Sequence, residues 1–139
     1  MPNLARDAKL EIIVSSLREK FVASAGEKLD RIDRGIMALM SIPADNTAGV
    51  KNQAQEISRL VHTLKGTAGS FGFMSISRIA EAFEAYLAAS SLSGRAAASD
   101  AHLYIQTIRT IIDSGIEPSE DETTRLIGAL PSPAQLAVG

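Results

Sequence analysis

Two histidines occur in the 139 residues, and one of them, His62, stands among residues suited to chemistry at an exposed ring. Lys65, Gly66 and Gly69 follow it three, four and seven positions later, which is the spacing of one side of an α-helix. An imidazole with an unperturbed pKa of about 6.5 carries a free lone pair near neutral pH and can act as a nucleophile. The spacing therefore predicts a reactive histidine with a lysine and two glycines beside it.

The direction of His62 follows from the apolar residues around it. Six of them recur at helical spacing and define one buried face: Ile57, Leu60, Val61, Leu64, Ala68 and Phe71. At about 100° per residue, His62 points about 140° away from the centre of that face, and Gly66 and Gly69 share its outward side. A glycine inside a helix costs about 0.5–1 kcal/mol relative to alanine. Two glycines beside an exposed imidazole favour a surface cleared for a macromolecular partner.

Ordinary explanations exist for each of these residues. An exposed histidine or lysine is commonly a solvated surface residue, and helix glycines often permit close packing of helices. These glycines face away from the apolar stripe, which disfavours the packing explanation. A metal site is poorly supported, because His102 is the only other histidine and no histidine pair has the spacing of helix ligands.

Composition excludes several classes of protein. The chain is 45% hydrophobic and 22% charged, which is typical of one globular domain with its own core. A net charge of −2, with 4% aromatic residues and no tryptophan, disfavours nucleic-acid binding. The absence of cysteine excludes disulfides, thiol catalysis and Cys-ligated metals. No apolar run approaches the roughly 20 residues of a membrane span and no signal peptide is evident, so we expect a soluble, cytoplasmic protein without membrane contact.

The apolar periodicity predicts an all-α chain. Amphipathic stripes run over residues 10–21 and 22–39, with Gly26 as a candidate bend that nothing requires, and Pro43 ends this region. The further helices are expected over these ranges: 47–71, from the N-cap Ser75 to 87, and 101–115. Ser90, Ser91, Ser93 and Gly94 form a turn-like cluster between the last two. Residues 1–115 thus form an antiparallel bundle, and residues 116–139 a peripheral tail with one short helix at 123–130.

The run His62-Thr63-Leu64-Lys65-Gly66, followed by Ala68-Gly69-Ser70-Phe71-Gly72-Phe73, resembles the signature of histidine-containing phosphotransfer (HPt) domains. The resemblance implies a four-helix bundle with an additional N-terminal helix. It also implies a phosphoryl carrier of two-component phosphorelays, without catalytic turnover of its own. The matching His62 would take a phosphoryl group from an aspartyl phosphate on a receiver domain and pass it to another receiver.

The same resemblance implies roles for the residues near His62. Lys65 would steady the phosphoryl oxygens, and Gly66 and Gly69 would leave room for the receiver. Mg²⁺ would come from the receiver's acidic pocket, since this chain has no acidic cluster beside His62 and needs no cofactor of its own. The alternatives are the phosphate-accepting N-terminal domain of a chemotaxis-type histidine kinase and a receiver-binding module that does not transfer phosphate.

Glu84 is the candidate partner of the imidazole. If the helices around His62 and Ser75 form a hairpin turning at Gly72–Phe73, Glu84 lies opposite His62, since both are eleven residues from Phe73. HPt domains commonly carry a polar residue there, which would hold Nδ1–H and leave Nε2 as the nucleophile. The ordinary explanation is a solvated glutamate.

The partner surface is predicted around His62. Its apolar part would come from the N-terminal helix, with these candidates: Ile12, Ile13 and Val14. Its polar rim would come from Arg59, Lys65 and Arg78. We expect a monomer that engages response-regulator receivers and a hybrid histidine kinase through a small, transient interface. His102 is predicted to be a surface residue, and Met37 and Met40 to fill the core.

Overall fold

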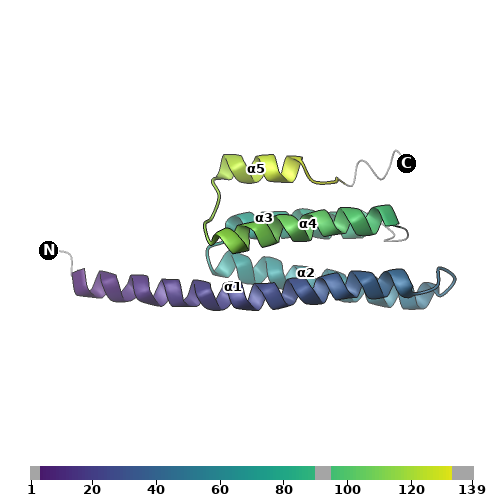
Figure 1. Ribbon diagram of the computed structural model, residues 1–139, viewed down its shortest axis with the longest axis horizontal. Coiled ribbons are helices and arrows are strands. Elements are labelled where there is room, and N and C mark those ends of the chain that lie inside the picture. Colours follow the sequence, from purple (N-terminus) through teal and green to yellow (C-terminus); the bar gives the residue numbers. More distant parts are fainter. Residues whose placement is uncertain (1–3, 90–94, 133–139) are drawn as a thin grey trace.

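The computed structural model describes residues 4–89 and 95–132, and all regular structure in that part is α-helical (Figure 1). The five helices have these bounds: α1 Leu4–Ser41, α2 Thr47–Ser70, α3 Met74–Ala89, α4 Arg95–Ser114 and α5 Glu120–Gly128. The predicted all-α helix bundle is confirmed. The turn expected at residues 90–94 lies outside the described residues.

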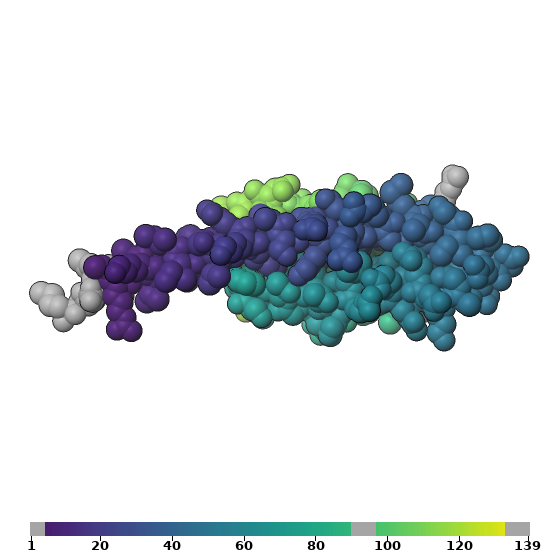
Figure 2. All heavy atoms as spheres, turned by 90° about the horizontal axis from the view of Figure 1, so that it is seen from below, coloured from purple at the N-terminus to yellow at the C-terminus, as the bar shows by residue number. Residues whose placement is uncertain are grey.

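The first helix is longer than the bundle it belongs to. α1 has 38 residues, about 57 Å at 1.5 Å per residue, and its N-terminal part projects beyond the other helices (Figures 1 and 2). No separate N-terminal helix exists, because α1 runs through Gly26 without a break. The extension is continuous with the first bundle helix.

The projecting part of α1 is solvent-exposed although its apolar residues have core-like spacing. Phe21 is the first buried residue, and these large apolar residues before it are exposed: Leu10, Ile12, Ile13, Val14 and Leu17. The apolar stripe over residues 10–21 is therefore exposed for most of its length, as a partner surface that includes Ile12, Ile13 and Val14 requires. Periodicity identifies which face of a helix is apolar, but α2 ends at Ser70 and leaves no helix to cover this stretch.

The core lies between the C-terminal half of α1 and helices α2, α3 and α4. Phe21 stacks on Phe71 and Phe73 at the end where α2 turns into α3, with ring centroids 5.6 and 5.2 Å apart. Phe83 of α3 stacks on Tyr104 of α4 at 4.9 Å. These ring contacts fix α2 and α3 against both neighbours, and so fix the two helices that carry His62 and Glu84.

Met37 and Met40 were expected in the core, and that expectation is wrong. Met37 is 68% exposed and Met40 is 49% exposed. Leu39, which lies between them in sequence, is the residue of this stretch that is buried in the core. The two methionines line an open hollow beside α4 instead.

Two glycines end helices as the sequence predicts. Gly72 has φ 84° and closes α2, and Gly115 has φ 68° and closes α4. Residues with a side chain rarely adopt these left-handed values, so the helices stop at these positions. The α2–α3 turn is therefore short, and the two helices lie antiparallel.

The start of α3 differs from the prediction. Ser75 was expected to cap the helix, but α3 begins at Met74 and Ser75 is buried within its first turn. Glu117, from the segment after α4, accepts hydrogen bonds from the Ser75 backbone N–H at 2.9 Å and from its hydroxyl. A carboxylate 42 residues away in sequence thus satisfies the first turn of α3.

The segment after α4 packs onto α3. Ser119 caps α5 by accepting from the Glu122 N–H at 3.1 Å, so the helix begins three residues before the predicted 123. Thr123 and Leu130 are buried there. None of the helices in the described ranges is both long and apolar enough to cross a membrane.

Candidate functional site

His62 lies on the exposed side of α2, where its ring reaches Glu84 of the neighbouring helix α3. Its side chain is 69% exposed, and its Nδ1 is 3.3 Å from Oε2 of Glu84. The antiparallel hairpin brings these residues together from 22 positions apart. The proximity inferred from the hairpin is therefore observed, and it leaves Nε2 as the ring nitrogen not engaged by Glu84.

The other oxygen of Glu84 faces Lys65. Lys65 Nζ is 3.1 Å from Oε1 and forms an ion pair with it, although the geometry of the contact is not that of a hydrogen bond. Oε1 is itself buried, so the ammonium compensates a carboxylate oxygen that water does not reach. One carboxylate thus contacts both His62 and Lys65.

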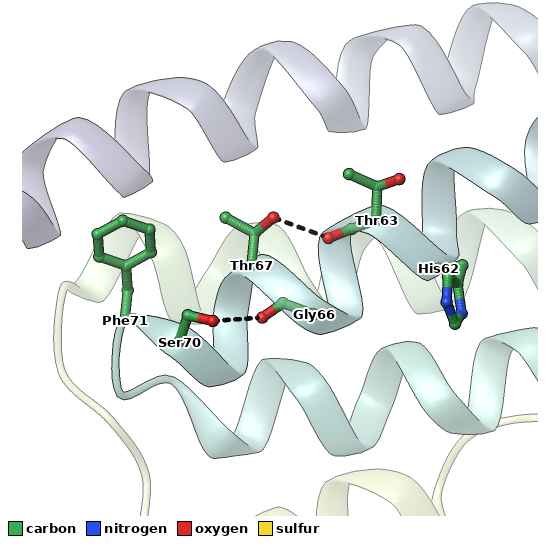
Figure 3. A pocket seen from close by; sticks show the side chains of 6 residues that line it. All are labelled: His62, Thr63, Gly66, Thr67, Ser70 and Phe71. Atoms are coloured by element: carbon green, nitrogen blue, oxygen red, sulfur yellow. Dashed lines mark hydrogen bonds between the residues drawn. The ribbon is translucent and has the colours of Figure 1, made fainter.

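An open hollow runs along α2 from His62 toward the α2–α3 turn. It encloses about 540 Å³ and is lined by His62, Thr63, Gly66, Thr67, Ser70 and Phe71 (Figure 3). A Cβ built on Gly66 would meet nothing within 4 Å, so this glycine faces open space, as the sequence predicts. A partner can therefore approach the ring from this side.

The hydroxyl groups of the hollow are turned back onto the helix. Thr67 Oγ1 donates to the Thr63 carbonyl at 2.8 Å, and Ser70 Oγ donates to the Gly66 carbonyl at 3.0 Å (Figure 3). Thr63 Oγ1 donates in the same way to the Arg59 carbonyl. Because these donors are already used, cationic side chains must supply most of the attraction for an incoming anion.

Gly69 does not share the open face of Gly66. It is half-buried, and a Cβ built on it would lie 3.6 Å from Ser77 Oγ of α3. Around α2, Gly69 lies about 20° from His62 on the side that faces α3. Ser77 of α3 packs against it there. Gly69 therefore contributes to the α2–α3 contact rather than to the hollow.

The predicted polar rim is only partly near His62. Arg59 is exposed on α2 and is ion-paired with Glu56. Arg78 is on the other side of α3, where its guanidinium donates to Thr124 Oγ1 of α5 at 3.4 Å. Arg78 therefore lies beside α5, and its place in the rim around His62 stays a prediction.

The apolar part of the predicted surface divides between two sides of α1. Ile12 is about 100° from Ile13 and about 200° from Val14 around the helix, so the three residues do not form one patch. Val14 and Leu17 line a second hollow together with Ser70, Phe71 and Gly72. Ser70 and Phe71 also line the His62 hollow, so Val14 is continuous with the site and Ile12 is not.

The other histidine also has a carboxylate partner, which sequence reasoning missed. His102 Nδ1 of α4 is 3.4 Å from Asp33 Oδ1 of α1, and the His102 side chain is 52% exposed. The packing of α1 on α4 brings them together from 69 positions apart, so no local sequence signal marks the pair. Among the described residues, no group of three or more His, Asp or Glu side chains is arranged to hold a metal ion.

Comparison with known families decides what this bundle is. The model of the Hpt domain family matches residues 16–114, which include α2, α3 and the bundle part of α1. The chain belongs to the Hpt domain family. No curated protein and no solved structure gave a match.

Hpt domains are histidine-containing phosphotransfer modules of two-component systems, and they act as phosphocarriers that interact with receiver domains and histidine kinases. The matched segment contains His62, Lys65 and Glu84. The first twelve residues of α1 and all of α5 lie outside the Hpt match. The matched region of this chain is thus flanked by the N-terminal part of α1 and by α5.

Proposed function

We propose that His62 accepts a phosphoryl group from the aspartyl phosphate of one receiver domain and passes it to the aspartate of another. The observation that carries the proposal is the exposed ring of His62, with Nδ1 3.3 Å from Glu84 and with open space at Gly66 one turn later. Within the Hpt family, this combination supports a phosphorelay carrier that works inside the cell and has no turnover of its own.

The transfer begins from the tautomer that Glu84 favours. A carboxylate accepts a hydrogen bond from a ring nitrogen only when that nitrogen carries the proton, so the pair with Glu84 places the proton on Nδ1 and the lone pair on Nε2. That lone pair attacks the phosphorus in line, the N–P bond forms, and the P–O bond to the aspartate breaks with its electron pair on the departing carboxylate. Glu84 balances the charge of the resulting imidazolium.

Lys65 is the proposed partner of the phosphoryl oxygens. Its ammonium is held near the ring by Glu84, and one turn of helix separates Lys65 from His62. Rotation of this flexible side chain moves Nζ from Oε1 of Glu84 toward a phosphoryl group on Nε2. A Mg²⁺ ion that would neutralise the transferring group would be held by the acidic pocket of the receiver.

The receiver surface is proposed to combine the His62 hollow with the neighbouring part of α1. Val14 and Leu17 meet Phe71 at the end of this hollow. Because one histidine must reach each receiver aspartate in turn, two receivers compete for the same surface. A small, weak interface of a monomer suits this exchange.

The test is transfer from a panel of phosphorylated receivers to the wild-type chain and to His62→Gln. We expect label on the wild-type chain from its cognate receivers and none on the variant. Circular dichroism must show equal helicity for both chains. Labelling of the variant at the wild-type rate by any receiver in the panel contradicts the proposal.

A further inference from the structure

The charges of α1 are divided between two of its sides. Toward α4, Asp30 and Asp33 both accept hydrogen bonds from Arg109, at 2.7 and 3.3 Å. Toward α2, Lys28 donates to Thr67 Oγ1 at 3.4 Å. The helix therefore presents carboxylates to one neighbour and a lysine to the other.

Lys28 belongs to a strip of basic residues, which we call the basic edge: Lys20, Lys28 and Arg31. At about 100° per residue these three lie within about 80° of one another, whereas Asp30 and Asp33 lie about 140–200° from Lys28. Lys20 and Arg31 are exposed and Lys28 is half-buried. None of the three makes an ion pair with another residue in the described ranges.

The basic edge borders the His62 hollow. Thr67, the acceptor of the Lys28 hydrogen bond, lines that hollow, and Figure 3 shows α1 running alongside Thr63 and Thr67. α1 and α2 also lie side by side on the face seen in Figure 2. A macromolecule that covers the hollow therefore comes close to the basic edge.

The cations nearer to His62 are already balanced. Lys65 is ion-paired with Glu84, and Arg59 with Glu56. The exposed Glu27 lies about 40° from Arg31 around α1, so the basic edge and Glu27 together carry two excess positive charges, on a chain whose net charge is −2. Unbalanced charge beside a docking site steers an oppositely charged partner and raises its association rate.

We propose that the basic edge is the electrostatic docking surface for the acidic face of the receiver that surrounds its phosphorylated aspartate. It sets the rate of encounter and the choice of partner, and it takes no part in bond making at His62. The inference rests on the proposed function, since it assumes that a receiver covers the hollow. An anionic membrane also attracts basic helices, but the contact between Lys28 and the wall of the hollow favours the receiver.

The experiment compares Lys28→Glu and Arg31→Glu with Arg125→Glu. Arg125 is exposed on α5, away from α2, and its reversal changes the net charge by the same two units. Each chain is labelled in two ways, by a phosphorylated cognate receiver and by phosphoramidate, a small donor that needs no docking. The receiver reaction is measured at about 20 mM and about 500 mM salt, which changes the Debye length from roughly 20 Å to a few ångströms.

At low salt we expect Lys28→Glu and Arg31→Glu to slow labelling by the receiver about three- to tenfold, with the difference shrinking at high salt. Arg125→Glu should stay within about twofold of the wild type, and labelling by phosphoramidate should be equal in all chains. Equal receiver rates for Lys28→Glu and Arg125→Glu overturn the docking surface. A membrane role would also overturn it. In that case the wild-type chain binds vesicles of about 30% phosphatidylserine in phosphatidylcholine, Lys28→Glu abolishes this binding, and the receiver rates stay unchanged. Absence of label on His62 from both donors contradicts the proposed function instead.

Discussion

His62 and His102 are held in similar ways on different sides of the bundle. Each ring has Nδ1 near a carboxylate, at 3.3 Å from Glu84 and at 3.4 Å from Asp33. Each carboxylate also contacts a cation, which is Lys65 in the first group and Arg109 in the second. A histidine–carboxylate pair orients a ring, and the comparison shows that it does not by itself make a phosphoryl-accepting site.

The two groups differ in charge and in access. Beside His102, Arg109 is matched by both Asp30 and Asp33, which leaves one excess negative charge, whereas Lys65 and Glu84 balance each other. Burial alone lowers the pKa of Arg109, but the hydrogen bonds and the negative charges of the two aspartates together outweigh this and raise it. A phosphoryl group brings about −1.5 to −2 charges, so the His102 environment repels it more.

Access separates the groups as well. One turn after His62, Gly66 leaves open space. The hollow beside His102 is walled by larger side chains, among them Met37 and Met40. A receiver can bring its aspartate against the first ring over the helix surface that Gly66 leaves open, whereas no glycine lines the hollow beside the second ring.

The largest effect is expected from filling the space at Gly66. Gly66→Gln should slow labelling by a receiver about a hundredfold or more, because the side chain occupies the approach to the ring. Helix propensity favours glutamine over glycine, so the free energy of unfolding should stay equal or rise by up to about 1 kcal/mol. Stopped-flow labelling and thermal melts measure the two effects.

Gly26→Gln is the matched control, since a Cβ at Gly26 also meets nothing within 4 Å. It should have a similar melt and label at the wild-type rate. Loss of the cooperative melt in Gly66→Gln would mean that this glycine packs against something, contrary to the open space described.

The next effect is expected from the cation beside the ring. Lys65→Ala should slow phosphoryl transfer to His62 about thirtyfold, since hydrogen bonds to charged groups contribute about 1.5–3 kcal/mol. Lys51→Ala, an exposed lysine near the start of α2, should leave the rate within about twofold. Rapid-quench transfer kinetics provide the comparison, and equal rates for the two variants would remove Lys65 from the site.

A smaller effect is expected at Glu84. Glu84→Ala should slow transfer about tenfold by releasing the ring, while Glu84→Gln keeps an oxygen that can accept Nδ1–H and should lose about threefold. Nitrogen NMR of the His62 ring should show a reduced Nδ1–H tautomer in the alanine variant and its retention in the glutamine variant. An unchanged tautomer ratio in the alanine variant is incompatible with an orienting role.

The smallest effect is expected in the second group. Asp33→Ala removes the partner of His102 but should change labelling of the chain by less than about twofold. Arg109 keeps Asp30, and exposed ion pairs contribute about 0–1 kcal/mol, so the melt should change little. A large loss of label in this variant would show that the two histidine groups are coupled.

Local sequence signals predicted much of the bundle. The positive-φ glycines at 72 and 115 mark helix ends because few other residues adopt that backbone conformation. The equal distance of His62 and Glu84 from Phe73 predicted their proximity, because a short turn fixes the register of the helices on either side. Both signals work because each depends on how the chain turns at a single glycine.

Long-range packing explains what local sequence signals did not predict. Nothing near Ser75 indicates that Glu117 satisfies the start of α3, and nothing near Arg78 indicates that α5 reaches it. The prediction that Met37 and Met40 fill the core failed for a similar reason, since an apolar residue is buried only where a second element covers it. The pairing of His102 with Asp33 likewise depends on the packing of α1 against α4, which no local pattern encodes.

The most direct test of the account is to locate the phosphate after transfer from a cognate receiver. The wild-type chain, His62→Gln and His102→Gln are labelled, and the phosphopeptides are mapped by mass spectrometry under alkaline conditions that preserve phosphohistidine. We predict acid-labile, alkali-stable phosphate on His62 in the wild type and in His102→Gln, and no label on His62→Gln. Phosphate on His102 or on a hydroxyl residue in the wild-type chain would contradict the account.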